Sequence, residues 1–413
     1  MYTELNLRLT ERQEALKASV HKFAKEVFRP AGEQIEKLAP DDIVRENSVW
    51  WECKRKFRDI ELHTTFIPEK FGGLGMGPLE HHIVWEELGW GSAGLALSQD
   101  VDVYPASWCL RISPKNEFLI EEFVKPYVND TEAKMVGCWG MTEPNRGSDS
   151  LIAGLPEFRD PDIKHNVKAR QDGNRWIISG QKSAWVSDGP AATHTLLFLG
   201  IDQSKGMKGG GIAVVPLDLP GVSKGPILRK LGQIDLPQGE LFFDDVEIPN
   251  EYMLTGPNRY EFWVQQVLSV ANCGMSSVFT GVARAAFELA LDYAKERVQG
   301  GKLLSRHQLI QKKLFDMFVR VETARAFSRA AVEYCFSVIP APIEYAVSAK
   351  VYCTQAAYQN ADEALQIYGG YGLSKEYPVE KIYRDTRASL IEDGTSEVLS
   401  LIGAHNIIKT YFA

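Results

Sequence analysis

The sequence feature that most limits how this chain can fold is a change in the period of its apolar residues, near residue 131 and again after Pro249. Before residue 131 and after Pro249, apolar residues recur at helical spacing. Between them, four short apolar runs separated by turn residues predict strands: Trp176-Ile-Ile-Ser, Thr195-Leu-Leu-Phe-Leu, Ile212-Ala-Val-Val and Glu240-Leu-Phe-Phe. Because no helical segment separates these runs, an antiparallel barrel or sandwich is favoured over a doubly wound parallel sheet. We therefore predict an α+β protein with an N-terminal helical domain (1–130), a middle β domain (131–249) and a C-terminal helix bundle (250–413).

The first helix of the N-terminal domain is predicted from residue 9 to Pro30. Thr10 and Gln13 have the spacing of a capping box, and four apolar residues up to Val27 fall on one face. Proline lacks the backbone N–H that an inner helical position needs, so we expect the helix to end at Pro30.

Composition excludes several classes of function. The 413 residues include 46 Lys+Arg against 54 Asp+Glu, a net charge of −8 that opposes binding to nucleic acid. The six cysteines have no CxxC pair, so we expect free thiols in a reducing compartment, the cytoplasm, and no metal site. The start of the chain lacks the apolar core of a secretory signal, and no later stretch is apolar for long enough to span a membrane.

The segment Gly137–Asp149, Gly-Cys-Trp-Gly-Met-Thr-Glu-Pro-Asn-Arg-Gly-Ser-Asp, lies at the predicted edge of the β domain. Its hydroxyls and backbone N–H groups suit the polar atoms of a cofactor, and Gly147 allows close approach of the backbone. The alternative is an ordinary Pro/Gly turn.

Part of this segment, Met141-Thr-Glu-Pro-Asn-Arg-Gly-Ser-Asp149, resembles the TEPxxGSD signature of the acyl-CoA dehydrogenase family. Further blocks resemble the same family in the same order, over essentially the whole chain: Trp176–Ser187, Lys230-Leu-Gly with Leu241–Pro249, Arg297 with Gly301–Gln308, Gln366–Gly372, Tyr377–Asp385 and Gly394-Thr395. The resemblance implies the same helix, strand, helix layout. It also implies FAD as cofactor and oxidation of an acyl-CoA to its 2,3-enoyl-CoA, with an electron-transfer flavoprotein as acceptor.

The resemblance implies two groups of cofactor residues. The first surrounds the flavin ring: Trp139, Met141, Thr142, Gly147, Ser148, Trp185, Ser187, Thr395 and Glu397, with Ser148 also near the substrate. The second reaches the adenosine and pyrophosphate of a FAD bound to a neighbouring subunit: Arg297, Gln308, Gln366 and Gly370. A homotetramer or homodimer is therefore expected.

The family's reaction needs a carboxylate that removes the proton next to the thioester carbonyl, usually a glutamate directly before Gly-Thr. Here that position is Asp393, preceded by Glu392, and either carboxylate is a candidate base. Aspartate is one methylene shorter, and a displacement of about 1 Å can cost on the order of a hundredfold in rate. A pair of carboxylates that only caps the following helix is the alternative.

Other positions depart from the family pattern. Asn272 stands where several members have arginine, Ala271 removes an alternative base, and Gly300 replaces a usual phenylalanine. An aspartate base also resembles the nitroalkane oxidase branch, but that branch has an arginine seven residues later, where this chain has Ser400. A flavin-bearing protein associated with nucleic acid is a third possibility, which the acidic composition disfavours.

The acyl pocket is expected to include the segment Ser98–Tyr104, which contains Asp100 and Asp102. If either faces the flavin, it would serve as a second acid or bind a polar or cationic acyl group. The alternative is a solvated helix end. The segment between Asp149 and Asp172 is longer than usual in the family, with no effect assigned.

Overall fold

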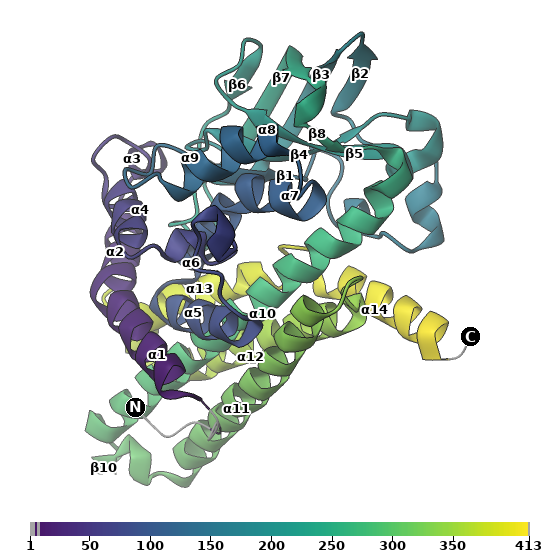
Figure 1. Cartoon of the computed structure of the whole chain (residues 1–413). Coiled ribbons are helices and arrows are strands. Elements are labelled where there is room, and N and C mark those ends of the chain that lie inside the picture. The colour runs from purple at the N-terminus through teal and green to yellow at the C-terminus, as the bar shows by residue number, and fades with distance from the viewer. Residues whose placement is uncertain (1–4, 6–8, 412–413) are drawn as a thin grey trace.

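The computed structural model describes Leu5 and residues 9–411, in which a helical part, a sheet and a second helical part follow each other along the chain (Figure 1). Most of the chain start, where no secretory signal is expected, lies outside the described residues. The N-terminal helices are α1 (Glu11–Phe23), α2 (Arg29–Ile35), α3 (Pro40–Ile43), α4 (Val49–Asp59), α5 (Pro78–Gly91), α6 (Ala93–Asp102), α7 (Tyr104–Ile112), α8 (Glu117–Leu119) and α9 (Lys125–Val128).

The expected end of the first helix at Pro30 is wrong. The capping box is present, with the Gln13 N–H donating to Thr10 Oγ1 over 3.3 Å, but the helical run continues to Ile35. A π-helical turn at Ala24–Phe28 precedes α2, and the Arg29 N–H donates to the carbonyl of Ala24, five residues back. This extra residue starts a new helix, and Pro30 lies in its first turn, where a missing N–H is tolerated.

The four predicted runs lie in strands β3, β4, β5 and β7, which confirms the middle β domain. Its strands are β1 (Gly137–Gly140), β2 (Lys168–Asp172), β3 (Arg175–Ser187), β4 (His194–Gly200), β5 (Gly210–Pro216), β6 (Val222–Lys224), β7 (Gln238–Pro249) and β8 (Met253–Thr255). The order is β6-β7-β3-β2-β4-β5-β8, with β1 paired to β4. The last strand, β8, lies beyond the predicted boundary at 249.

Two pairings differ from the antiparallel expectation. Strand β1 runs parallel to β4, and β2 meets β4 in a parallel contact between Lys168 and Gly200. Parallel neighbours need a long connection. The chain between β1 and β4 is long enough because it contains the β2–β3 hairpin, so turn geometry does not force an antiparallel direction there.

The C-terminal part is a helix bundle, as predicted: α10 (Pro257–Glu296), α11 (Gln308–Ser337), α12 (Ile343–Tyr368), α13 (Pro378–Ser389) and α14 (Ser396–Tyr411), with a short hairpin of β9 (Val298–Gln299) and β10 (Lys302–Leu303). Helix α10 has 40 residues. At about 1.5 Å per residue it is roughly 60 Å long, and it runs from the sheet to the far end of the bundle (Figure 1). A single 3-10 helical segment, Gly369–Leu373, joins α12 to α13.

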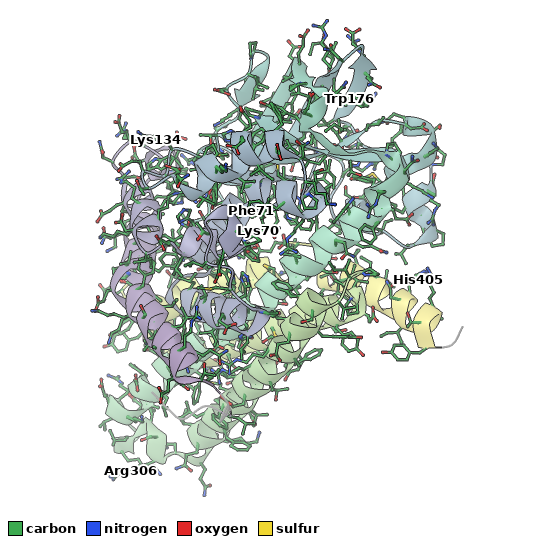
Figure 2. The ribbon with its side chains drawn as sticks, viewed as in Figure 1. Lys70, Phe71, Lys134, Trp176, Arg306 and His405 are labelled. Atoms are coloured by element: carbon green, nitrogen blue, oxygen red, sulfur yellow. The ribbon has the colours of Figure 1, made fainter. Side chains whose placement is uncertain are left out.

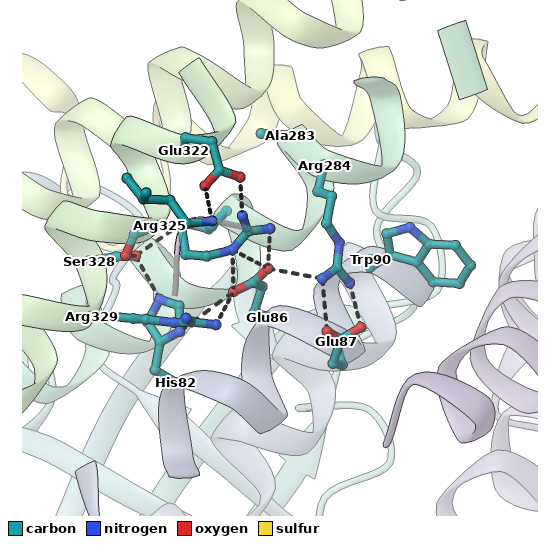
Figure 3. Close-up of polar contacts among 12 residues, drawn as sticks. His82, Glu86, Glu87, Trp90, Ala283, Arg284, Glu322, Arg325, Ser328 and Arg329 are labelled. Carbon is teal, nitrogen blue, oxygen red and sulfur yellow. Dashed lines mark hydrogen bonds and ion pairs between the residues drawn. The ribbon is translucent and has the colours of Figure 1, made fainter. Parts of the chain in front are cut away.

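A buried charge network joins the N-terminal helices to this bundle (Figure 3). Glu86 of α5, which is 1% exposed, accepts hydrogen bonds from Arg284 of α10 and from Arg325 and Arg329 of α11. These guanidinium groups outweigh the effect of burial and hold the pKa of Glu86 well below its usual value. Glu87 binds Arg284 as well, so both buried carboxylates of α5 are compensated.

Among the described residues, no helix is long and apolar enough to cross a membrane. Within the same part of the chain, no cluster of three or more His, Cys, Asp or Glu side chains has the arrangement of a metal site. All six cysteines are free and buried.

Candidate active site

Asp393 lies in the turn between α13 and α14, and its backbone has a φ of +53°. Such a conformation is costly for a residue with a side chain and persists when the surroundings hold it. Here α10 and α12 hold it: Asn272 Nδ2 lies 3.5 Å from the carbonyl oxygen of Asp393, and Lys350 Nζ donates to the carbonyl of Gly394 over 2.9 Å.

The loop after β1 holds the same turn from the other side. The Thr395 N–H donates to Ser148 Oγ over 3.0 Å. The Ser148 of the signature segment and the Gly394-Thr395 pair are therefore in direct contact, although they are far apart in the sequence. Glu397 is exposed on the first turn of α14.

The carboxylate of Asp393 is available for chemistry. No hydrogen bond to its side-chain oxygens is found within residues 9–411. Burial raises the pKa of Asp393 to about 6, and the Lys350 ammonium acts in the opposite direction. A carboxylate with this pKa is ionised at neutral pH and is a stronger base than an ordinary aspartate.

Glu392 has different surroundings from its neighbour. Gln233 Nε2 donates to Glu392 Oε1, and Gln233 also donates from its backbone N–H to Asp385 of α13. Burial and the charge of Asp393 raise the pKa of Glu392 to about 7. The Glu392 carboxylate is therefore engaged with the connection between β6 and β7, while that of Asp393 has no such partner.

Asp100 is buried beside this turn and is not part of a solvated helix end. It is 5% exposed, and its Oδ2 accepts a hydrogen bond from Tyr104 Oη over 3.3 Å. Burial, followed by the charge of Asp393, raises the pKa of Asp100 to about 8. The carboxylate packs against Gly274 of α10, where an added Cβ would come within 3.2 Å of Oδ2.

Asp102 is also buried, but its carboxylate is already occupied. Oδ1 accepts from the Gly137 N–H over 2.8 Å, and Oδ2 binds Arg58 at 3.1 Å and Lys54 at 3.5 Å. The expected substrate contact of Asp102 is therefore not supported by its surroundings, because both oxygens stabilise the junction between α4, α6 and β1.

Two of the predicted cofactor residues are tryptophans, one on β1 and one on β3. Trp139 of β1 packs 5.7 Å from the Tyr104 ring, and its buried Nε1 has no hydrogen-bond partner within the described chain. Trp185 and Ser187 of β3 are two residues apart and so project from the same face of the sheet. The Trp185 side chain is 55% exposed, an unusual position for an indole.

A buried ion pair joins two family-like segments of the β domain, Met141–Asp149 and Trp176–Ser187. Glu143 Oε1 lies 2.8 Å from Lys182 Nζ, and the same ammonium donates to the carbonyl of Met141 over 3.0 Å. Lys182 thus holds the backbone around Met141 and Thr142 in place.

The second group of predicted cofactor residues lies elsewhere. Arg297 and Gly370 line a groove of about 530 Å³ at the far end of the bundle, where the Arg297 guanidinium lies 5.3 Å from the Tyr371 ring. Gln308 and Gln366 are exposed on α11 and α12. Arg297 follows the end of α10 and lies roughly 36 Å along that helix from Asn272, at about 1.5 Å per residue.

Figure 2 shows that the start of β3 and the start of α11 are far apart. Trp176 of β3 and Arg306, which directly precedes the segment leading into α11, are at opposite ends of the molecule. Within one chain, the structure brings Ser148 and Thr395 into contact and places Arg297 and Gly370 in a separate groove.

Comparison with known proteins assigns the family. Residues 10–111, 138–246 and 263–408 match the N-terminal, middle and C-terminal domains of acyl-CoA dehydrogenase. The bovine mitochondrial short-chain specific acyl-CoA dehydrogenase is 30% identical over 408 residues, which cover 98% of this chain and 92% of that protein. The chain belongs to the acyl-CoA dehydrogenase family.

Other acyl-CoA dehydrogenase relatives cover the chain equally well. Acryloyl-CoA reductase (NADH) of Anaerotignum propionicum is 29% identical over 98% of this chain and 96% of its own. The structure of butyryl-CoA dehydrogenase from Megasphaera elsdenii has a TM-score of 0.84 and 27% identity, and covers 98% of this chain and 100% of its own. The protein is thus an oxidoreductase of the acyl-CoA dehydrogenase family.

Members of the acyl-CoA dehydrogenase family are FAD-dependent flavoproteins, and the residues present fit that cofactor. The exposed indole of Trp185 and the unpaired Nε1 of buried Trp139 are suited to the face and the polar edge of a flavin ring. At Gly147 an added Cβ would meet no atom within 4 Å, so the backbone there is open to a ligand.

Sequence reasoning missed three residues of this site. Lys350 is 0% exposed and stands alone among the small and apolar residues of α12, and this isolated charge was a usable signal. Tyr104 and Gln233 carry no pattern that distinguishes them. Ser400 is exposed on α14 and donates to the carbonyl of Ser396, so nothing there replaces the arginine of the nitroalkane oxidases.

Proposed function

We propose that this protein is an acyl-CoA dehydrogenase in which Asp393 removes the α-proton of an acyl-CoA thioester to give the 2,3-enoyl-CoA. The observation that carries the proposal is the Asp393 turn. It has a carboxylate with no hydrogen-bond partner in the described chain and a pKa raised to about 6. Its backbone is held by Asn272, Lys350 and Ser148.

In the proposed reaction, the Cα–H bond breaks and its proton goes to an Asp393 oxygen. FAD, when bound, supplies the acceptor for the hydride that leaves the β-carbon. Lys350 keeps the turn in position and favours the ionised base before the proton is taken. Tyr104, which packs against Trp139, donates a hydrogen bond to Asp100.

The short side chain of Asp393 is accompanied by another short side chain, Asn272, on the helix that contacts its turn. Asn272 is shorter than the arginine that several family members have there, yet its amide reaches the carbonyl of Asp393. A short side chain on α10 lets the turn lie close to that helix. We infer that this approach compensates for the methylene that aspartate lacks.

We further propose a homodimer or homotetramer that passes electrons to an electron-transfer flavoprotein in the cytoplasm. The separation of Arg297 and Gly370 from the Asp393 turn supports the assembly, because the groove at one end of a chain then serves the flavin of its neighbour. The six free, buried thiols suit a reducing compartment.

The test is an anaerobic titration of the purified holoenzyme with acyl-CoA thioesters and nitroalkanes, followed by the visible absorbance of the flavin. We expect thioesters to bleach the flavin and Asp393→Asn to abolish this bleaching. The matched control is Glu392→Gln, which we expect to remain reducible. Bleaching by nitroalkanes alone would favour a nitroalkane oxidase, and loss of bleaching only in Glu392→Gln would make Glu392 the base.

A further inference from the structure

The Asp393 turn has a second carboxyl beside it that the proposed reaction does not use. Asp100 faces α10 at Gly274 and is close enough to Asp393 for the two charges to interact. The side chain that contacts it with a polar atom is Tyr104, a neutral phenol. The nearby Lys350 ammonium donates to the carbonyl of Gly394. Thus no cation contacts Asp100 anywhere in the described part of the chain.

Several buried polar atoms of neighbouring residues also lack partners. They include Asp100 Oδ1, Asn272 Oδ1 and Gln99 Nε2, and these three residues are at most 5% exposed. Leaving a buried acceptor unsatisfied costs about 1–3 kcal/mol. A plain hydrocarbon acyl chain would satisfy none of these atoms, whereas a ligand with hydrogen-bond donors would satisfy both oxygens.

Asp102, on the same helix as Asp100, is a buried carboxylate whose charge is compensated by cations. It lies two residues away on α6 and is bound by Arg58, Lys54 and the Gly137 N–H. Cations of α4 therefore compensate Asp102 on one side of α6, whereas none contacts Asp100 in the described part of the chain.

We propose that Asp100 binds an ammonium group on the acyl chain, so that the substrate is the thioester of an amino-substituted carboxylic acid. This proposal rests on the proposed function, because it assumes that a thioester occupies the space beside Asp393. The ammonium donates to Asp100 Oδ1 and places its positive charge near the carboxyl groups of Asp100 and Asp393, where it favours their ionised forms.

Proton release distinguishes this role from a merely structural one. Without a ligand, burial and Asp393 raise the pKa of Asp100 to about 8, so it carries a proton at neutral pH. An ammonium beside it favours the ionised form, and the O–H bond then breaks with loss of the proton to solvent. An uncharged acyl chain leaves that proton in place.

The experiment is calorimetric titration of the holoenzyme with matched thioesters of coenzyme A. One set is 3-aminopropanoyl, 3-hydroxypropanoyl and butanoyl, which have the same number of heavy atoms. A second pair, 4-(dimethylamino)butanoyl and 5-methylhexanoyl, places the amine farther along the chain. In at least one set we expect the ammonium thioester to bind on the order of 10- to 100-fold more tightly than its neutral isostere.

Repeating the calorimetric titration in buffers of different ionisation enthalpy measures how many protons are released when a thioester binds. At about pH 7 we expect release of about one proton with the preferred ammonium thioester and none with its isostere. In Asp100→Asn the preference collapses and the release disappears, while the isostere still binds.

The outcomes separate this inference from the proposed function, because calorimetry does not require turnover. A neutral or hydroxyl thioester that binds as tightly as the ammonium, in both sets, overturns the ammonium site even if all thioesters bleach the flavin. A preference retained in Asp100→Asn overturns it as well. A preference for the ammonium thioester without bleaching of the flavin supports the ammonium site and contradicts the dehydrogenase activity. A protein that binds no thioester contradicts both proposals.

Discussion

Asp100 and Asp102 are of the same type, lie on the same helix and are both buried, but their surroundings give their charges opposite consequences. Asp102 forms ion pairs with Lys54 and Arg58, which compensate its carboxylate. Asp100 has no cation, and its pKa is raised to about 8. At the scale of single residues, the type and the spacing of the two aspartates do not decide their roles.

We expect Asp100→Asn and Asp102→Asn to shift thermal stability in opposite directions. Folded protein keeps the Asp100 proton up to about pH 8, whereas an unfolded aspartate loses it near about pH 3.9. The native state therefore loses stability as pH rises through this window, and asparagine avoids the loss. Thermal unfolding without substrate should show Asp100→Asn more stable by a few degrees at about pH 8 and nearly equal to the wild type at about pH 4.

Asp102→Asn serves as the matched comparison. Removing this carboxylate leaves Arg58 and Lys54 with less opposing charge, which we expect to lower the unfolding temperature at neutral pH. Destabilisation of both variants at about pH 8 would contradict the distinction drawn between the two carboxyls.

The pH dependence of flavin reduction belongs to Asp393. Because the base must be ionised, the rate constant for reduction by a subsaturating thioester should rise with pH through about 6 and then level off. Stopped-flow absorbance between about pH 5 and pH 8 measures this profile. Asp393→Asn should lower the rate by at least about 10²-fold, and a rate that is already maximal at the acidic end would argue against this base.

At the scale of elements, α5 is the helix through which the N-terminal domain contacts the bundle. Ten consecutive residues of α5, from His81 to Trp90, are buried, including both glutamates. A helix that is buried all round must have its charges compensated by its neighbours, and Arg284 of α10 and Arg325 and Arg329 of α11 do this.

We expect Glu86→Gln to destabilise the protein strongly. It removes the carboxylate that these three guanidinium groups share, which costs roughly 3–5 kcal/mol for a buried pair. Thermal or urea unfolding measures the change. The control is Glu52→Gln, which breaks the exposed pair with Lys56, and it should leave the unfolding transition unchanged. Equal effects of the two substitutions would show that the buried network has no special role.

At the scale of the whole molecule, the separation of the Asp393 turn from Arg297 predicts complementation between subunits. Asp393→Asn lacks the base, and Arg297→Glu places a negative charge in the groove proposed for the pyrophosphate. In a mixed dimer one site carries both defects and the other carries neither. Unfolding and refolding an equal mixture with FAD should therefore restore about a quarter of the wild-type sites.

The readout is thioester-dependent flavin reduction, compared with each variant refolded alone. If both residues served one flavin within the same chain, no mixed assembly would contain an intact site. An inactive mixture whose mixed dimers are demonstrated by differently tagged subunits would thus contradict a shared site.

The order of helices, strands and helices was predictable because hydrophobic period is a local property of the chain. The signature segment and the Glu392-Asp393-Gly394-Thr395 stretch were also recognisable as continuous stretches of sequence. The prediction was wrong at Pro30, because a π turn shifts the hydrogen-bond register, and incomplete at β4, because a long connection leaves strand direction open.

The sequence by itself thus determined the order of the domains, the family and the pair of carboxylates, Glu392 and Asp393, that are candidates for the base. Only the tertiary structure decided that Asp102 meets Arg58 and Lys54, that Asp100 lies near enough to Asp393 for their charges to interact, and that Lys350 and Asn272 hold the turn. The physical reason is that period and motif are properties of neighbours in the chain. The charge state of a buried side chain, and whether its polar atoms find hydrogen-bond partners, depend instead on residues that the fold brings beside it from tens to hundreds of positions away.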